Sequence, residues 1–409
     1  MADQRLIPRP AYTRRLLGVT VRYRLAPWWL RVTVVFVASR LITTGLLLAT
    51  AAGQAANPWT GAHPSYLDYA KIWDGHWYYI VALVGYPGTL PMTDTGNVGE
   101  NQWAFMPGYP MLVRALMLIT GLDFKPLAVF VSVAFAFGTV LVFYKLLVRV
   151  LPSGTALFAV VLYCVAPLSP ILQVAYAESM FLFFVTLGLY LLVERRYVAL
   201  LPVIVVMSLT RPGGLAFALT IGIQIVVRYR GRRTDAFGLR ERIEAAVALV
   251  VSIAAGLAWI VVAGVVTGVA GAYTQTELAW RSVYIGYREL IPFTSWLYGA
   301  NWWIPLPYGP ILLVLATVMV ALLLFTPWVR RLGVELRAWL ASYLLYVLAV
   351  FFPQSSTFRI LMPLFPALGA IAQPRSPVYR VSIVLACVAL QAGWLHIAWW
   401  YDGYDWTPP

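Results

Sequence analysis

Residues 244–269 read EAAVALVVSIAAGLAWIVVAGVVTGV, and no charged side chain follows Glu244 in this stretch. A run of this length and polarity is typical of a helix that crosses a bilayer, which takes about 20 apolar residues. Similar runs recur from 31–53 onward along the whole chain. The sequence lacks the short alternating segments that mark transmembrane barrels. It therefore predicts an all-α polytopic membrane protein.

The composition of the whole chain agrees with this class. Of the 409 residues, 61% are hydrophobic and 11% are charged, whereas a soluble domain has about 25% charged residues. This difference excludes a soluble enzyme, a nucleic-acid-binding module and a disordered protein. The formal net charge of +14 indicates basic cytoplasmic loops and contacts with anionic lipids, with no nucleic-acid partner.

The apolar runs predict eleven transmembrane spans within one domain. They cover 31–53, 126–150, 154–171, 177–193, 197–210, 212–228, 244–269, 308–328, 336–352, 358–372 and 378–400. A shorter apolar stretch, 104–121, contains two prolines and Arg114, and could be a span or a helix at the membrane surface. The basic N-terminus has no signal-peptide cleavage site, so we expect 31–53 to remain as a helix.

The basic residues predict the orientation. If 104–121 does not cross and the N-terminus is cytoplasmic, 22 Lys and Arg residues lie on the cytoplasmic side and seven on the outer side. If 104–121 crosses, every later loop changes sides and the bias collapses. We therefore expect a cytoplasmic N-terminus (1–30), long outer loops at 54–125 and 270–307, and an outer tail (401–409).

Function is expected on the outer face. Both long outer loops are rich in Trp and Tyr, which stack on sugar rings and populate membrane interfaces. No HExxH, CxxC, Walker or GxGxxG pattern occurs, and Cys164 and Cys387 lie within apolar runs. The sequence therefore predicts neither a metal site nor a nucleotide site.

The first outer loop contains the segment KIWDGHWYY (71–79). Asp74 is predicted to cap a short helix over 75–84 that ends at Gly85. A capping carboxylate keeps one oxygen free, so the same residue could also deprotonate a sugar hydroxyl, with His76 positioning that hydroxyl.

Four further segments place charged residues at helix ends on the outer side. They are ENQWAFMPGYP (100–110), AYAESMF (175–181), SLTRPGG (208–214) and QSSTFR (354–359). Glu100 is either a solvated cap or a second carboxylate near Asp74. Glu178 either complements a helix dipole or faces a wet cavity. Arg211 and Arg359 either extend to the membrane surface or bind a phosphate. A further charge, Arg40, lies inside a span and must be paired or line a cavity.

Several of these motifs resemble the PIG-V family, the mannosyltransferases that add the second mannose of the GPI anchor, together with bacterial relatives. The motifs are WD (73–74), ExxxAFxPxYP (100–110), YxESxF (176–181) and TRPGG (210–214). The resemblance covers roughly 30–215. It implies a GT-C glycosyltransferase that uses a polyprenyl-phosphate sugar, with the catalytic carboxylate in the first outer loop.

The resemblance also implies roles for individual residues. The catalytic set is Asp74 as base, His76 and Glu100, and the substrate-binding set is Lys71, Trp73, Gln102, Tyr176, Glu178, Arg211 and Arg359. Polyprenyl-phosphate mannose would be the donor, transfer would invert the anomeric centre, and no metal or other cofactor is expected. Arg211 or Arg359, with Lys71 as a third candidate, would meet the departing phosphate, and aromatic residues of 270–307 would cover the cavity.

The Ala-, Val- and Arg-rich composition with only three Lys is typical of high-GC actinobacteria. A bacterial plasma membrane is therefore expected, with a phosphatidylinositol mannoside or lipoglycan as the glycolipid acceptor. Two alternatives stay open. One is transfer of another sugar, such as arabinofuranose or glucose, and the other is transport of a lipid or solute.

Overall fold

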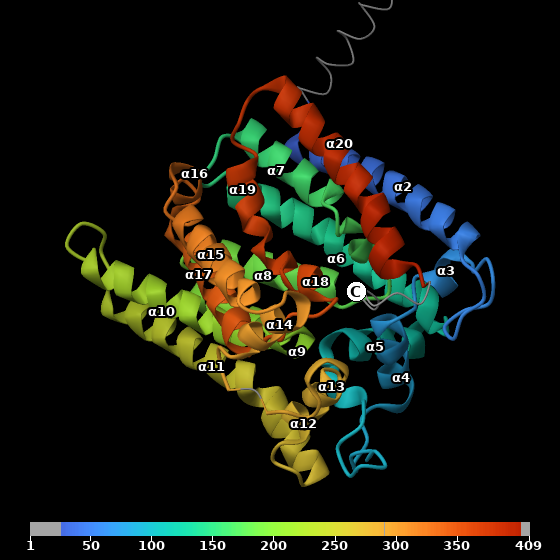
Figure 1. Cartoon of the computed structure of the whole chain (residues 1–409). Helices are drawn as coiled ribbons and strands as arrows, with labels where there is room; N and C mark the ends of the chain where they lie inside the picture. The colour runs from blue at the N-terminus through green and yellow to red at the C-terminus, as the bar shows by residue number, and fades with distance from the viewer. Residues whose placement is uncertain (1–25, 290, 402–409) are drawn as a thin grey trace, which may run out of the picture.

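The computed structural model describes residues 26–289 and 291–401, which form a bundle of helices (Figure 1). The longer helices are α2 (Trp28–Gly53), α5 (Gly108–Thr120), α6 (Phe124–Leu147), α7 (Ser153–Val165), α8 (Glu178–Val193), α9 (Tyr197–Thr210), α10 (Gly214–Arg230), α11 (Leu239–Thr267), α15 (Tyr308–Leu323), α17 (Gly333–Val350) and α20 (Pro377–Trp394). The shorter ones are α3 (Tyr66–Tyr69), α4 (Asp74–Val84), α12 (Ala272–Ala279), α13 (Ser282–Ile285), α14 (Ser295–Trp303), α16 (Pro327–Arg330), α18 (Thr357–Ile360) and α19 (Leu368–Ile371). Most of the predicted N-terminal segment (1–30) and nearly all of the predicted tail (401–409) lie outside the described residues.

The predicted all-α membrane class is confirmed. Among the described residues, five helical segments are long and apolar enough to cross a membrane: α2, α6, α11, α17 and Pro377–Trp399. The other predicted spans correspond to shorter apolar helices, such as α9, whose bounds match the predicted 197–210. The total of eleven crossings and their orientation remain predictions.

Two predicted spans are wrong as continuous helices. The predicted 154–171 ends as an α-helix at Val165, and a 3-10 turn follows over Ser169–Gln173. The predicted 358–372 divides into α18, a 3-10 segment over Met362–Ala367, and α19. Prolines explain both breaks, because a proline lacks the N–H that an α-helix needs and disfavours helical backbone in the residue before it.

The centre of the bundle is formed by α6 packed on α8, by α9 and α10 packed on α11, and by α17 packed on α10. The crossing of α10 and α11 brings the two backbones together at glycines. A Cβ on Gly214 would lie 2.7 Å from the Gly256 Cα atom, so neither position can hold a larger residue without moving a helix. The Ser252 hydroxyl also donates to the Gly214 carbonyl (2.8 Å). This crossing fixes the start of α10, directly after Arg211.

The stretch 104–121 forms the 13-residue helix α5, which packs on α4 and α6. Thirteen helical residues span about 20 Å, less than the hydrocarbon thickness of about 30 Å. Leu118 and Ile119 on this helix are each 79% exposed. Exposed apolar residues of this kind contact lipid in a surface helix and in a crossing alike, so the surface-helix alternative remains a prediction.

The end of the described chain closes over the first loop. The Trp399 carbonyl accepts a hydrogen bond from the Trp73 indole (3.1 Å), and the Trp399 indole donates to the Tyr69 carbonyl (3.3 Å). Gln54 and Tyr401 form two hydrogen bonds of 2.8 and 3.0 Å. We call residues 395–401 the C-terminal clamp, because they hold α3 and the start of α4 against the bundle.

Arg40 is buried inside α2 and binds backbone carbonyls. Its Nη1 atom donates to the Ser169 carbonyl (2.8 Å) and its Nη2 atom to the Cys164 carbonyl (2.7 Å). These carbonyls lie where the prolines interrupt α7 and leave backbone acceptors without helical partners. The expectation that Arg40 is paired is therefore confirmed, and its guanidinium secures the turn that leads to Tyr176 and Glu178.

We expect Arg40→Met to destabilise the fold, because it leaves two buried carbonyls without donors at a cost of about 1–3 kcal/mol each. Thermal unfolding in detergent, followed by tryptophan fluorescence, measures the effect. Arg149→Met is the matched control: it breaks an exposed pair with Glu194, and such pairs contribute about 0–1 kcal/mol. Equal melting temperatures for the two variants would contradict a structural role for Arg40.

Candidate active site

Helix α4 presents Asp74 as its first residue, after a strained turn. Trp73 has φ +58° and ψ −126°, a conformation that L-residues rarely adopt and that clusters at functional sites. The Trp73 ring is held by Trp59 and Tyr401, with centroids 5.3 and 5.6 Å away. The predicted short helix and its end at Gly85 (φ +76°) are confirmed. Capping by Asp74 is wrong, because the helix includes Asp74 and its carboxylate turns to Arg359 instead.

Four charged side chains from distant parts of the chain form one network. Arg359 Nη1 binds both Asp74 Oδ2 and Glu178 Oε1, the latter at 2.9 Å. Arg211 Nη1 binds the same Glu178 oxygen at 2.7 Å. The side chains of Arg359 and Glu178 are 8% and 3% exposed. Two carboxylates and two guanidinium groups balance in charge, as buried ions must.

The ends of the helices determine this arrangement. Glu178 begins α8 and Arg211 directly follows α9, so these consecutive helices bring both side chains to one end of the bundle. A carboxylate at the start of α8 is also favoured by the helix dipole. Gly108 packs against the end of α9, where a Cβ would lie 2.7 Å from the Thr210 hydroxyl. Arg359 lies in α18, the short helix with which the divided segment 358–372 begins.

Tyr176 supports the network from behind. Its hydroxyl accepts a hydrogen bond from the Asp74 backbone N–H (3.2 Å). The Arg359 guanidinium lies over its ring, 5.3 Å from the centroid, at a distance that allows a cation–π interaction. Tyr176 is fully buried and therefore orients both Asp74 and Arg359.

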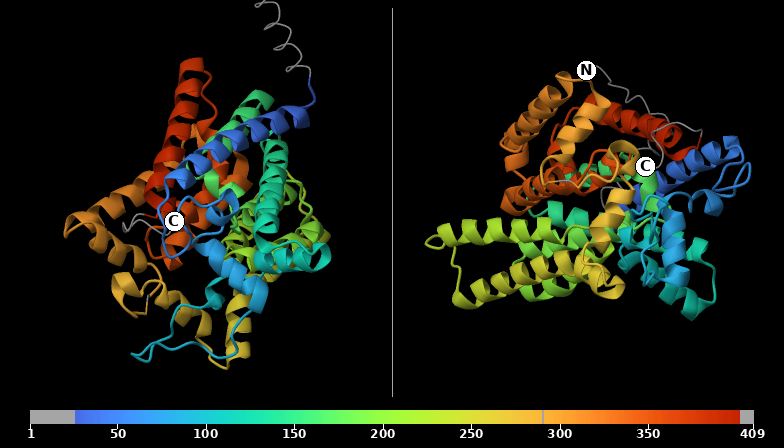
Figure 2. Two further views of the ribbon diagram at one scale, coloured as in Figure 1. Left: turned by 90° about the vertical axis from the view of Figure 1, so that its right-hand side faces the viewer. Right: turned by 60° about the horizontal axis from the view of Figure 1, so that its bottom comes forward.

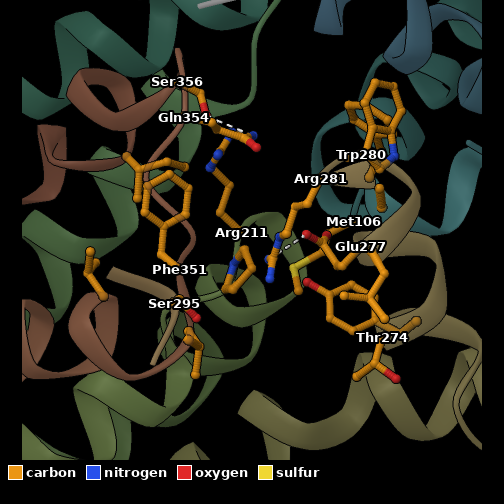
Figure 3. Close-up of a pocket in the computed structure, with 18 of the residues that line it drawn as sticks. Met106, Arg211, Thr274, Glu277, Trp280, Arg281, Ser295, Phe351, Gln354 and Ser356 are labelled. Carbon is orange, nitrogen blue, oxygen red and sulfur yellow. Dashed lines mark hydrogen bonds and ion pairs between the residues drawn. The ribbon is translucent and has the colours of Figure 1, made fainter. Parts of the chain in front are cut away.

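The network lies in the wall of a cavity of about 1090 Å³. Of the residues predicted for the site, Asp74, Glu100, Arg211 and Arg359 line it. Figure 3 shows Arg211 extending into it between the segment that carries Phe351 and the one that carries Trp280. The predicted aromatic cover from 270–307 is confirmed by its lining residues Tyr273, Trp280, Tyr284, Trp302 and Trp303.

Other predicted site residues do not line this cavity. His76 lies two positions after Asp74 on a helix, where side chains do not face each other, and its ring packs on Trp59 (5.5 Å) and Tyr79 (6.4 Å). The Lys71 ammonium lies over the Tyr79 ring at 4.5 Å. Trp73 packs under the C-terminal clamp, and Gln102 is a half-buried residue that begins a 3-10 turn. Their roles toward substrate remain predictions.

Burial changes the pKa values of Asp74, Glu100 and His76. It raises the pKa of Asp74, and the positive charge of Arg359 opposes that rise. Burial also raises the pKa of Glu100 and lowers that of His76, where the nearby Lys71 adds to the shift. A carboxylate with a raised pKa is a better proton acceptor, which suits Asp74 to general-base chemistry.

Sequence reasoning missed several residues of the cavity wall. They are Tyr78, Glu277, Arg281, Tyr343, Tyr346 and Gln354. The sequence could have predicted Tyr78, because this residue lies four positions after Asp74 on the same face of the helix. Glu277 and Arg281 form an i,i+4 pair, a pattern that exposed helices also show.

Within residues 26–289 and 291–401, no group of three or more His, Cys, Asp or Glu side chains is arranged to hold a metal ion.

The chain is similar to a solved membrane-enzyme structure but to no described family. No protein-family model and no curated protein matches the chain. Among solved structures, the chain is similar to the archaeal oligosaccharyltransferase AglB from Archaeoglobus fulgidus, described in complex with an inhibitory peptide and a dolichol-phosphate. The TM-score is 0.44 and the identity 13%, over 88% of this chain and 54% of that chain. The chain thus spans about half the length of this neighbour.

Proposed function

We propose that this protein is a membrane glycosyltransferase that moves mannose from polyprenyl-phosphate mannose to a lipid-linked acceptor. The acceptor is of the phosphatidylinositol mannoside or lipoglycan type, and transfer takes place on the outer face of a bacterial plasma membrane. One observation carries the proposal. The carboxylate of Asp74, whose side chain is 15% exposed, pairs with Arg359 next to the pair of Arg211 and Glu178, in the wall of a large cavity at one end of the helical bundle.

The proposed reaction starts at Asp74. Its carboxylate accepts the proton of the acceptor hydroxyl, whose oxygen attacks C1 of mannose from the side opposite the phosphate. The bond between C1 and the phosphate oxygen breaks, and its electron pair stays with the phosphate. One attack from the opposite side inverts the anomeric centre. A lipid phosphate leaving group with a second negative charge results, and a cation must stabilise it.

The network suggests how that cation is supplied. Arg359 neutralises the Asp74 carboxylate before the reaction. When Asp74 takes up the proton it loses its charge while the leaving phosphate gains one, so Arg359 can change its partner from the base to the phosphate. Arg211 pairs with Glu178 and lines the cavity, which makes it the second donor for the phosphate. The total charge of the site is unchanged throughout the step.

The choice of mannose is supported by the motifs that resemble the PIG-V family. Asp74, Glu178 and Arg211 lie within those motifs, and the network joins them to Arg359, which follows Asp74 by 285 residues. Transport is the competing proposal from another class. It requires charged groups in the middle of the membrane, whereas buried Arg40, the charge inside α2, is bound to backbone carbonyls.

The decisive experiment supplies purified protein in lipid nanodiscs with labelled polyprenyl-phosphate mannose and a panel of inositol-mannoside lipids. We expect labelled glycolipid and free polyprenyl phosphate as products, and the same rate in EDTA, since no metal takes part in the proposed step. Polyprenyl-phosphate arabinose and polyprenyl-phosphate glucose are the competing donors. Transfer from one of these alone would overturn mannose, and absence of donor binding and of every transfer would overturn the enzyme class.

We expect the transfer rate to fall as the pH is lowered, starting above the ordinary Asp pKa of about 3.9. The reason is that burial raises the pKa of Asp74, and only the unprotonated carboxylate can accept a proton. Initial rates at saturating donor, measured from neutral pH downward, test this. A melting temperature measured at each pH separates titration from unfolding, and a rate that stays constant down to the ordinary Asp pKa would contradict the prediction.

A further inference from the structure

A second polar wall of the cavity is formed by α12 and the residue after its C-cap. Glu277, Trp280 and Arg281 all line the cavity, and Figure 3 shows them on one segment, across from Phe351 and Ser295. We call these three residues the α12 wall. None of them takes part in the Asp74 network, so their presence in the cavity needs a separate explanation.

The α12 wall presents both a hydrogen-bond acceptor and donors. Arg281 Nη2 and Glu277 Oε2 are 3.1 Å apart, and the two side chains are 15% and 25% exposed. Both therefore keep part of their surface open to the cavity. A guanidinium and a carboxylate side by side cancel in net charge. Such a pair favours an uncharged ligand with hydroxyl groups, since each hydroxyl both donates and accepts hydrogen bonds.

Trp280 adds an aromatic surface to the α12 wall. Its indole Nε1 atom is buried and has no hydrogen-bond partner among the described residues. The ring is fixed by Trp77 and Phe105, with centroids 5.2 and 5.6 Å away. Because this nitrogen is buried, the part of Trp280 that lines the cavity is its apolar ring.

The α12 wall is braced against the first loop. Asn101, next to Glu100, donates to the Thr276 hydroxyl (2.9 Å). The Trp259 indole donates to the Trp103 carbonyl (3.0 Å), and Ala272 packs in the same cluster. Figures 1 and 2 show α12 and α4 at the same end of the molecule. The wall therefore holds a fixed position relative to Asp74.

The size of the cavity permits two substrates. Pockets of about 300–1,000 Å³ enclose a drug-sized ligand, and this cavity has about 1090 Å³. The arginines of the Asp74 network suit an anionic donor phosphate, whereas the charge-balanced α12 wall suits a neutral ligand. The two walls thus differ in the chemistry that each can recognise.

We infer that the α12 wall binds the uncharged, hydroxyl-rich sugar and inositol rings of the acceptor headgroup, an inference that rests on the proposed glycosyl transfer. Neighbouring hydroxyls of a sugar or inositol ring donate to Glu277 and accept from Arg281. The Trp280 ring supplies an apolar face for the C–H side of the same ring. The acceptor hydroxyl to be glycosylated then points toward Asp74.

The test separates the kinetics of the two substrates. In nanodiscs, Glu277→Gln is expected to raise the KM for the inositol-mannoside acceptor roughly 10- to 100-fold, as the loss of a charge-assisted hydrogen bond predicts. The KM for polyprenyl-phosphate mannose should stay within about twofold of wild type on the same reasoning. Arg281→Gln should act in the same direction. Glu244→Gln, which breaks an i,i+4 pair on α11, is the matched control and should change neither KM.

The outcomes distinguish the two proposals. Wild-type protein that neither binds nor turns over the donor would overturn the proposed function itself. If both folded variants show normal donor kinetics and an unchanged KM for the acceptor, the inference that the α12 wall binds the acceptor is wrong, while the proposed function stands. The same conclusion follows if the variants raise the KM for the donor instead of the acceptor. Melting temperatures identify a variant that fails to fold. In that case Trp280→Ala, which removes the apolar face of the α12 wall and leaves Glu277 and Arg281 in place, provides the same comparison.

Discussion

Replacing Asp74 with Asn is expected to lower the transfer rate by at least about 10²–10⁴-fold, the contribution typical of a general base. The amide has nearly the same shape as the carboxylate but cannot take up a proton. Arg359 keeps Glu178 as a partner at 2.9 Å, so the variant should fold. The measurement is the initial rate of labelled glycolipid formation, together with donor binding, which should persist.

Asp68→Asn is the control for this variant. Asp68 belongs to the same long loop between α2 and α5, but it pairs with Lys125 and its side chain is 41% exposed. Its replacement should leave the rate close to that of wild type. If folded Asp74→Asn retains full activity, Asp74 has only a structural role. Glu100, which lines the same cavity and has a raised pKa, then becomes the next candidate for the base.

Arg359→Gln is expected to impair both folding and catalysis. The guanidinium is the shared partner of two buried carboxylates, Asp74 and Glu178. Removing one member of a buried ion pair typically costs about 3–5 kcal/mol, because the remaining charge loses its compensation. Catalysis should fall as well, because the leaving phosphate loses a donor. Thermal unfolding and the transfer rate in the same nanodiscs measure the two effects.

Arg359→Lys separates the two effects. Lysine keeps the charge but lacks the planar fork with which arginine contacts several oxygens at once. We expect it to recover most of the stability and little of the activity. A melting temperature for Arg359→Gln that equals the wild-type value would show that the network does not stabilise the fold. Full activity in Arg359→Lys would show that geometry at the phosphate is unimportant.

The class of fold was predictable because hydrophobic length is a local property. The run 244–269 can be identified as a helix from its own residues, without knowing which segments pack against it, and α11 covers most of it. The break within 358–372 was missed because hydropathy does not register how Pro363 and Pro366 interrupt an α-helix. That break places Arg359 on a short helix beside the cavity, so the missed feature is part of the site.

The residues of the network were predictable one by one but not as a network. Glu178 and Arg211 stood out because charges at the ends of apolar runs are uncommon. Their pairing depends on how α8 and α9 pack, which a single sequence does not state. His76 was predicted beside Asp74 from proximity in sequence, but a separation of two residues on a helix directs the side chains apart. Glu277 and Arg281 were missed because an i,i+4 pair has the same pattern on any exposed helix.

The C-terminal clamp has a consequence for the order in which the protein is made. Trp73 directly precedes Asp74. The indole of Trp73 binds the carbonyl of Trp399, which follows Trp73 by 326 residues. A ribosome therefore delivers the loop that carries Asp74 to the membrane long before it synthesises the residues that hold that loop in place. Until then, nothing from the clamp offsets the unfavourable backbone of Trp73. The site can reach its final geometry only after residues 395–401 have been synthesised, so a chain that stops before them would lack the contacts that hold Trp73 in place.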